Sequence, residues 1–594
     1  MNGELEWKVL QPPNHLVEDY MASLNVGRIV ASAFVNQKLP KETVAMIMDA
    51  RYADIYRPLN LCNIREAAVL IKEYIGKQNV TIVVFADYDT DGITSAAIAD
   101  KGLTRIINNV YPGKDIPIWY RIPERKEGYG LNDTFVEQMT LVAKNNPDME
   151  YLIITVDNGI TAKPFIQKLQ AEPNICVLVT DHHEPDYEND LTPTDICICV
   201  DPRLDPSSPG QNLAGCGVIF NVLQKLEEVC WLKHEVTQSL YYLNAIGTIG
   251  DMMNFDLYNM TVIQRGLFQL NQEPMVSWVK KAHNITKIDM FTTKDVAFTL
   301  SPIINSCGQM GHALKPFLLL TARTEDDTTS LFDDVYQIYN QNKAETKEAK
   351  KYAELDIMEN YIDKHKFIMY PMQTEHPGLA SKVATHLGKT IGRPIILWAE
   401  TEENADEEII AGSARNDTKI PVLDILRSAV RNGLAEAAEG HSYAFGVKIK
   451  RAKIPQLQKY LDDEVDQYEQ AHNGVITIDR TCVIDCLAST DEINVKTMND
   501  MASFPFLKNV PLPVVKIQGA KIYDARPSKN NPRNVCYTIQ SPDASHPIDV
   551  WVWDIKSDKY DKDIHTKVDM IGTVERDFRN PKCATLKVSD LRFY

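Results

Sequence analysis

The sequence lacks any apolar run near the ~20 residues that cross a membrane, and its first residues lack a basic segment followed by an apolar one. We therefore expect a cytoplasmic protein with no membrane contact. An excess of positive charge is also missing. A net charge of −18 excludes a uniformly basic surface, so a polyanionic partner would have to be bound by local patches.

The cysteines lack the paired spacing of a disulfide framework or a zinc finger. All 11 are scattered, and several lie in apolar runs such as 196–200. Cys482 and Cys486 have no second Cys or His pair at finger spacing behind them. This pattern indicates reduced thiols, many of them in the core.

What the chain does contain is an ordinary globular composition, with 44% hydrophobic and 24% charged residues over 594 positions. A chain this long should divide into roughly three or four domains. From about residue 16 to 320, apolar strands alternate with amphipathic helices. This alternation predicts an α/β fold with a doubly wound, mainly parallel sheet, whose ligands bind at the carboxyl ends of the strands.

Composition suggests four segments. Residues 1–321 would form the α/β domain with an N-terminal helical segment, and the polar residues 322–363 a long connector helix. Residues 364–473 would form a second, smaller α/β domain. From 474 to 594 the chain is rich in short strands and turns, which predicts a small β-barrel of the oligonucleotide-binding type. In that segment we expect strands at 475–478, 514–522, 535–539, 548–553 and 568–574.

Acidic and imidazole side chains follow several of the predicted strands. Asp87, Asp89 and Asp91 come directly after the apolar run 80–86, and Asp157 follows the run 151–156. Asp181, His182 and His183 follow the strand 175–180, and Asp251 ends the segment 247–251. An acidic calcium-like loop or a helix cap would explain residues 87–92 alone, but neither explains two adjacent histidines. The combination predicts a site for two divalent metal ions.

These motifs resemble the DHH phosphoesterase superfamily, and within it the RecJ family of bacterial 5′→3′ single-strand DNA exonucleases. The similarity includes the Asp-His-His at 181–183 and further motifs in the family's order. They are the segments 123–131, 213–218, 246–251 and 305–310, with Gly-Ser-Ala-Arg at 412–415 and Gly-His at 440–441, typical of the companion DHHA1 domain.

The resemblance implies a ligand set for two Mn²⁺ or Mg²⁺ ions. Asp89 and Asp157 would hold one ion, with Asp87 completing its shell. Asp91, Asp157, His182 and Asp251 would hold the other, so that Asp157 bridges the pair. His183 would face the scissile phosphate. On this scheme Asp87, Asp157 and His183 are the catalytic residues.

The family's substrate-binding positions are matched less completely. The resemblance implies that the nucleic acid is held by Arg125, Asn305, Gln309, Ser413, Arg415 and His441. Two positions depart from the family pattern: Gln309 stands where the family has Arg, and Glu439 where it has Gly. His312 lies close to Gln309 in sequence and is a candidate replacement for the missing cation.

The C-terminal segment combines cations with aromatic residues. The cations are Lys508, Lys516, Lys521, Arg526, Lys529 and Arg533. Tyr523, Tyr537, Trp551 and Trp553 lie among or just after them, which is typical of a stacking platform for single strands. The alternative is that Trp551 and Trp553, which alternate with Val552, share a core face.

Taken together, the sequence predicts a monomeric, metal-dependent exonuclease that digests single-stranded DNA from the 5′ end, in repair, recombination or replication. A single-strand-binding protein is a candidate partner. One alternative is a DHH phosphodiesterase acting on short oligonucleotides or cyclic dinucleotides, whose members resemble only the first two modules. The other is a replication scaffold without activity, although all the matched ligand positions are filled here.

Overall fold

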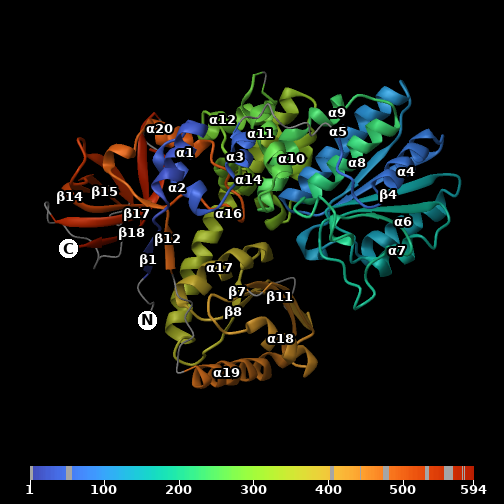
Figure 1. Ribbon diagram of the computed structural model, residues 1–594. Coiled ribbons are helices and arrows are strands. Elements are labelled where there is room, and N and C mark those ends of the chain that lie inside the picture. Colours follow the sequence, from blue (N-terminus) through green and yellow to red (C-terminus); the bar gives the residue numbers. More distant parts are fainter. Residues whose placement is uncertain are drawn as a thin grey trace.

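Figure 1 shows the computed structural model, which describes residues 5–48, 57–273, 275–401, 407–441, 443–472, 481–528, 534–553, 566–577, 580 and 582–594. Three modules surround a central helical layer. A parallel sheet lies on one side, a β-barrel on the other, and a smaller mixed sheet below at the end of a long helix. Within the described residues, no helix is long and apolar enough to cross a membrane.

The first sheet is entirely parallel, as predicted. Its strands are β2 (Val80–Ala86), β3 (Ile118–Arg121), β4 (Glu150–Val156), β5 (Ile175–Thr180) and β6 (Ile198–Val200), in the order β3-β2-β4-β5-β6. Because side chains alternate along a strand, Ile82 and Val84 pack into one core and Val83 and Phe85 into another.

Helices cover both faces of this sheet. On one face lie α4 (Ile64–Gly76), α5 (Thr90–Val110) and α8 (Gly215–Val229); on the other lie α6 (Asp133–Asn145) and α7 (Lys163–Leu169). The chain leaves β2 toward β3 on one side and later returns to place β4 on the other side. The carboxyl ends of β2 and β4 therefore flank the crevice in which open α/β sheets bind their ligands.

A helical layer follows, and it is where Asp251 is held. It comprises α9 (Glu235–Gln238), α10 (Tyr241–Gly250), α11 (Leu257–Asn271), α12 (Ser277–Thr286), α13 (Thr293–Asp295), a π-helical turn η3 (Val296–Leu300), α14 (Ser301–Gln309) and α15 (Leu314–Thr321). Asp251 directly follows α10. We had grouped it with residues at strand ends; it comes instead from the end of a helix.

The predicted connector is a single helix, α16 (Glu325–Asn360), which descends from the central layer to the smaller sheet. Thr324 caps its N-terminus by accepting a hydrogen bond from the Asp327 amide, and acidic residues fill its first turn, where they favour the helix dipole. Its buried residues recur every three or four positions from Thr328 to Thr346, so one stripe of the helix packs while the rest stays solvated.

The second sheet is mixed. Its strands are β7 (Ile368–Gln373), β8 (Ile395–Glu400), β9 (Ile409–Arg415), β10 (Ala437–His441) and β11 (Ala444–Lys450), in the order β10-β11-β9-β8-β7. Only β7 and β8 are parallel. Helices α17 (Ala380–Ile391), α18 (Val422–Arg431) and α19 (Ile454–Ala471) pack around it.

The C-terminal module contains a closed five-stranded barrel. Its strands are β14 (Val515–Pro527), β15 (Val535–Gln540), β16 (Ile548–Val552), β17 (Lys567–Arg576) and β18 (Ala584–Phe593), joined in the order β14-β15-β16-β18-β17 with β17 pairing back onto β14. Two-residue β13 (Cys486–Leu487) and helix α20 (Val495–Ala502) precede it. Strand β18 is not among the strands predicted from the sequence, and the strand expected at 475–478 lies outside the described residues.

The N-terminal segment packs against this barrel rather than against the parallel sheet with which we had grouped it. Strand β1 (Glu6–Val9) pairs in parallel with β12 (Thr481–Ile484). Helices α1 (Asn14–Leu24), α2 (Arg28–Asn36) and α3 (Lys41–Met48) follow, and Phe34 stacks on Phe504 at 5.0 Å. The apolar face of α2 packs against α20 and β13, in the same hydrophobic cluster as the barrel strands, a pairing that local sequence cannot reveal. The division of the chain at 321, 363 and 473 stays a prediction.

Candidate metal centre

The carboxyl ends of β2 and β4, the loop after β5 and the end of α10 bring six predicted ligands together. Ligand atoms of Asp87, Asp89 and Asp157 lie within 4.8 Å of one another, and so do those of Asp91, His182 and Asp251. A third group joins Asp157 with both His182 and His183. Asp157 and His182 are thus shared between groups, and a segment of over 160 residues separates the first ligand from the last.

The loop after β2 turns at once into helix α5. Asp89 caps that helix, because its carboxylate accepts hydrogen bonds from the amides of Asp91 (2.8 Å) and Gly92 (3.1 Å). The helix-cap interpretation of the acidic motif therefore holds for Asp89 alongside the metal interpretation. Asp91 lies in the first helical turn, which turns its side chain away from Asp89 and toward a different helix.

That helix is α8, whose N-terminus points at Asp91. The amides of Gly215 and Cys216 donate hydrogen bonds of 2.6 and 2.9 Å to the two oxygens of the Asp91 carboxylate. A helix N-terminus favours negative charge, so the arrangement fixes the Asp91 carboxylate in place. A Cβ atom at Gly215 would lie 2.6 Å from Oδ1 of Asp157, which explains why this position needs a glycine.

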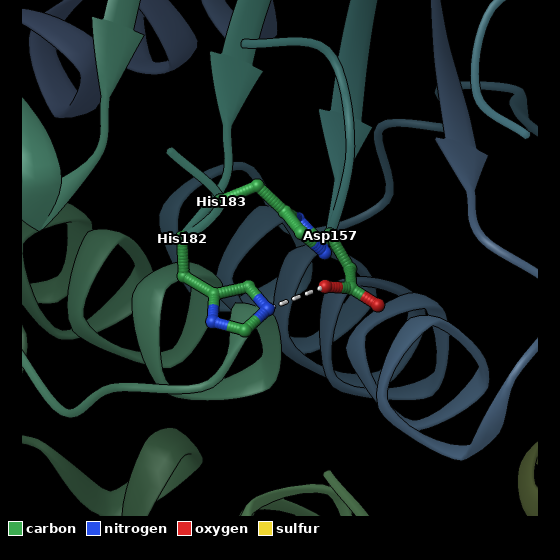
Figure 2. A group of neighbouring side chains, drawn as sticks. All are labelled: Asp157, His182 and His183. Atoms are coloured by element: carbon green, nitrogen blue, oxygen red, sulfur yellow. Dashed lines mark ion pairs between the residues drawn. The ribbon is translucent and has the colours of Figure 1, made fainter. Parts of the chain in front are cut away.

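His182 lies at the centre of the carboxylates. Figure 2 shows its ring beside Asp157, with Nε2 3.2 Å from Oδ1. The same nitrogen is 3.8 Å from Oδ2 of Asp91 and 3.8 Å from Oδ2 of Asp251. Burial lowers the pKa of His182, which favours the neutral imidazole that a metal requires.

Asp181 organises the histidine loop from behind. One oxygen accepts hydrogen bonds from the amide of His182 (2.7 Å) and from Nδ1 of His183 (2.8 Å); the other accepts one from the amide of Ile160 (2.9 Å). Desolvation disfavours a charged His183, but the contact with Asp181 outweighs it and raises the pKa of His183 to about 9. Asp181 is a positioning residue, and His183 carries a positive charge at neutral pH.

The site fits divalent cations. Burial raises the pKa of Asp87, Asp89, Asp157 and Asp251 above the usual range, and the neighbouring carboxylates raise it further. Oδ1 of Asp87 and Oδ1 of Asp157 are buried and accept no hydrogen bond from any described residue. Asp157 also has a left-handed backbone, at φ 60°, which aims its carboxylate at this cluster. So many buried carboxylate oxygens need cations between them.

Sequence reasoning overlooked Tyr129. Its hydroxyl lies 3.1 Å from the backbone oxygen of Asp157 and 3.1 Å from Nδ1 of His183. It therefore links the loop after β4 to the histidine loop. Its place between two glycines in the segment 123–131 was the available signal, because a tyrosine in a glycine-rich turn has little core to fill.

The predicted substrate-binding residues come from two parts of the chain. Arg125, Asn305 and Gln309 precede α16, and Ser413, Arg415 and His441 follow it. Arg125, Gln309 and Arg415 face the region between the parallel sheet and the second sheet. Arg125 and Gln309 line a cavity of 740 Å³ there, together with residues 373–378. Asn305 lies on α14, one turn before Gln309, and Ser413 precedes Arg415 by two residues on β9. The side chains of Glu439 and His441 lie outside the described residues.

Arg415 is held by helix α17 rather than by a carboxylate. Its Nε and Nη2 atoms donate to the hydroxyls of Thr385 (2.9 Å) and Ser381 (2.5 Å). Burial lowers the pKa of Arg415, and the charge of Arg125 lowers it further. No described carboxylate lies within ion-pair distance of either arginine, so both cations remain available to an anion.

Sequence reasoning also missed Lys382. His312 stays the candidate that the sequence offered in place of the arginine expected at position 309, and the structure adds Lys382. The Gln309 side chain accepts a hydrogen bond of 3.1 Å from Nδ2 of Asn342, whose Oδ1 accepts one of 2.9 Å from Lys382 Nζ. Burial, together with the charges of Lys350 and Arg125, lowers the pKa of Lys382 to about 8. No motif marked this lysine, which α17 brings in from another module.

Two of the predicted barrel cations form ion pairs. Lys516 forms an ion pair with Asp569 (2.7 Å), and Arg526 forms ion pairs with Asp524 (2.9 Å) and Asp549 (2.8 Å). Trp551 and Trp553 stack at 5.6 Å, and Trp553 is 45% exposed while Val552 is buried. The shared core face is therefore wrong for Trp553. Lys529 and Arg533 lie outside the described residues, and the platform itself stays a prediction.

Comparison with known families matches both modules. Residues 81–248 match the N-terminal domain of the DHH family, and residues 364–467 match the DHHA1 domain. The parallel sheet with its Asp-His-His loop is thus a DHH domain, and the mixed sheet beyond α16 is a DHHA1 domain.

RecJ exonucleases are its homologues. The chain is 27% identical to the single-stranded-DNA-specific exonuclease RecJ of Bacillus subtilis over 548 residues, and 28% identical to RecJ of Thermus thermophilus over 486 residues. These matches cover 91% and 81% of this chain but only 65% of each relative's length.

The fold matches as well. Crystal structures of Thermus thermophilus RecJ in complex with Mn²⁺ and with Mg²⁺ superpose with TM-scores of 0.76 and 0.71, at 22% and 21% identity. Both matches cover 100% of this chain, and 80% and 79% of those chains.

Proposed function

We propose that this chain is a metal-dependent exonuclease that hydrolyses single-stranded DNA, releasing nucleotides from the 5′ end. The observation that carries the proposal is the meeting of six ligand side chains around two buried carboxylate oxygens that accept no hydrogen bond, near cations that have no carboxylate partner among the described residues. The cluster of ligand side chains is suited to divalent metals, and the cations are suited to phosphates. The RecJ relatives, which are named for this activity, support the choice of substrate.

We assign the ligands as the groups of side chains suggest. Asp87, Asp89 and Asp157 would hold one Mn²⁺ or Mg²⁺ ion, and Asp91, His182, Asp251 and the shared Asp157 the other. When bound, two such ions supply Lewis-acid stabilisation for the attacking and leaving oxygens of an in-line displacement. Oxygen-rich ligation with a single imidazole suits Mn²⁺ or Mg²⁺ better than zinc.

The chain's own residues orient the substrate. His183, protonated and held by Asp181 and Tyr129, would donate a hydrogen bond to the scissile phosphate and offset its charge. Arg125, Arg415 and Lys382 would bind phosphates across the cleft, with Asn305, Gln309, Ser413 and His441 around them. A single-strand-binding protein remains our candidate partner.

The test is digestion of single strands of DNA and RNA labelled at either end, with Mn²⁺, with Mg²⁺ and with a chelator. We expect metal-dependent release of labelled mononucleotides from the 5′-labelled DNA first. Release from the 3′ end first would reverse the polarity. Cleavage restricted to strands of a few nucleotides would instead support the short-oligonucleotide phosphodiesterase, and no cleavage with any metal would support the scaffold.

A further inference from the structure

A segment of the C-terminal module is docked beside the metal centre. Residues 504–510, which we call the docking segment, connect α20 to β14. The hydroxyl of Thr293 donates a hydrogen bond to the backbone oxygen of Phe504 and accepts one from the amide of Phe506, both at 3.3 Å. Leu507 is buried in the same core as the parallel sheet. The docking segment is therefore fixed to the DHH side of the molecule.

A second anchor lies closer to the metal ligands. The amide of Lys508 donates to the backbone oxygen of Met253 (3.4 Å), and the amide of Phe255 donates to the side chain of Asn509 (2.5 Å). Met253 is two residues after Asp251. The Lys508 side chain is exposed, and its backbone is hydrogen-bonded two residues from Asp251. Lys508 thus brings a cation to the rim of the metal centre.

The docking segment also completes an aromatic pair. Phe506 packs against Phe298, with ring centroids 5.5 Å apart and an interplanar angle of 32°. Phe298 is 59% exposed, although Phe504 and Leu507 already supply the buried contacts of the segment. Phe506 is half-buried beside it, so the pair keeps an exposed face, chiefly on Phe298, for another flat, apolar group.

The aromatic pair lies close to the metal-binding loop along the chain. Phe298 belongs to η3, a π-helical turn of a kind that is frequent at functional sites. The next helix begins at Ser301, whose hydroxyl donates a hydrogen bond of 3.1 Å to that of Thr90. Thr90 lies between Asp89 and Asp91. The pair and Lys508 therefore flank the metal centre from the barrel side.

We propose that Phe298, Phe506 and Lys508 form a clamp for the single strand where it leaves the metal centre toward the barrel, with bases stacking on the two rings and a phosphate binding Lys508. Aromatic rings stack on every base, and the cation neutralises the adjacent backbone, so the clamp would be indifferent to sequence. This inference rests on the proposed function and deepens it by naming how the strand is held. The clamp requires both modules, because each contributes one ring.

The experiment measures binding of two DNA strands of the same sequence. One strand is intact, and the other has abasic sites at the nucleotides that follow the 5′-terminal ones. Measurements use the full chain with Asp157→Asn, to prevent cleavage, at low salt. We expect Phe506→Ala and Phe298→Ala each to weaken binding of the intact strand about 5- to 100-fold. For the protein with both rings intact, abasic sites in the strand should weaken binding by a similar factor. For Phe506→Ala, the abasic strand should bind nearly as well as the intact strand.

Controls separate the clamp from a structural role. Phe268→Ala removes a phenylalanine of similar exposure (60%) on α11 and should leave binding unchanged. Phe506→Trp should restore binding, Phe506→Leu should not, and Lys508→Gln should reduce the salt dependence of binding. An abasic penalty that is the same with and without the Phe506 ring would overturn the clamp. Absence of any single-strand binding or cleavage by the unmodified chain would instead overturn the proposed function.

Discussion

The Nζ atom of Lys382 donates a hydrogen bond of 2.9 Å to Oδ1 of Asn342, and Asn342 in turn donates to Gln309. This relay joins α17 to the position where the related family has an arginine. It places a lysine with a pKa of about 8 near Arg125, whose positive charge contributes to that low value. Lys382 is thus a cation near this position whose pKa of about 8 lies close to physiological pH.

Binding of a single strand with a 5′-phosphate should therefore weaken as the pH rises from 7 to 9. Below the pKa of about 8 the lysine is charged and binds phosphate; above that value it loses the charge. We expect roughly a tenfold loss of affinity. Lys382→Arg should bind equally well at both pH values, since arginine stays protonated. A pH profile for Lys382→Gln that matches the unmodified chain would contradict this role.

Replacing Asp157 by Asn should abolish turnover while preserving the fold. Asparagine accepts the left-handed backbone found at φ 60°, so the variant changes the charge of a shared ligand and little else. We expect a loss of about 1000-fold or more in the rate of cleavage with Mn²⁺. Far-ultraviolet circular dichroism and strand binding should be nearly unchanged. A folded variant that cleaves at close to the normal rate would remove the two-metal assignment.

His182 and His183 should differ in their effect on metal binding. His182→Ala removes a nitrogen that lies among three carboxylates and should lower Mn²⁺ affinity by at least about tenfold. His183→Ala should retain the metal and lose rate, because this ring is held by Asp181. Titration calorimetry with Mn²⁺ measures both. His183 also lies within reach of Asp157. If His182→Ala and His183→Ala lose metal equally, His183 is a metal ligand rather than a phosphate partner.

The N-terminal helices should be required for a stable barrel. Phe34 is fully buried and stacks on Phe504, so Phe34→Ala should lower the free energy of unfolding by about 3–5 kcal/mol. Chemical denaturation monitored by tryptophan fluorescence measures the change. As a matched control, Phe268→Ala on an exposed surface should shift it by less than about 0.5 kcal/mol.

The same packing determines how the barrel can be studied alone. A fragment of residues 474–594 leaves out the N-terminal helices that share its hydrophobic core and strand β1, which pairs with β12. We expect that fragment to bind a hydrophobic dye and unfold without a cooperative transition. Adding residues 5–48 through a linker should restore cooperativity. A cooperatively folded fragment without them would show that the helices are dispensable.

Local sequence determined the parallel sheet and most of its ligands. Strands β2 and β5 begin and end at the predicted residues, because both are short apolar runs bounded by turn residues. The ligands Asp87, Asp89, Asp91, Asp157 and His182 follow such strands directly. Since parallel strands end at a common edge, their positions in the sequence suffice to predict that these side chains meet.

Tertiary structure decided what sequence spacing cannot encode. Asp251 reaches the site from the end of a helix, Lys382 from another module, and Phe506 from the barrel. The helix α2 joins a core that also contains residues of the barrel module, more than 450 positions away. In each case two segments distant in sequence share one surface, and the choice between possible partners depends on shape and burial across the whole fold, which no local pattern records.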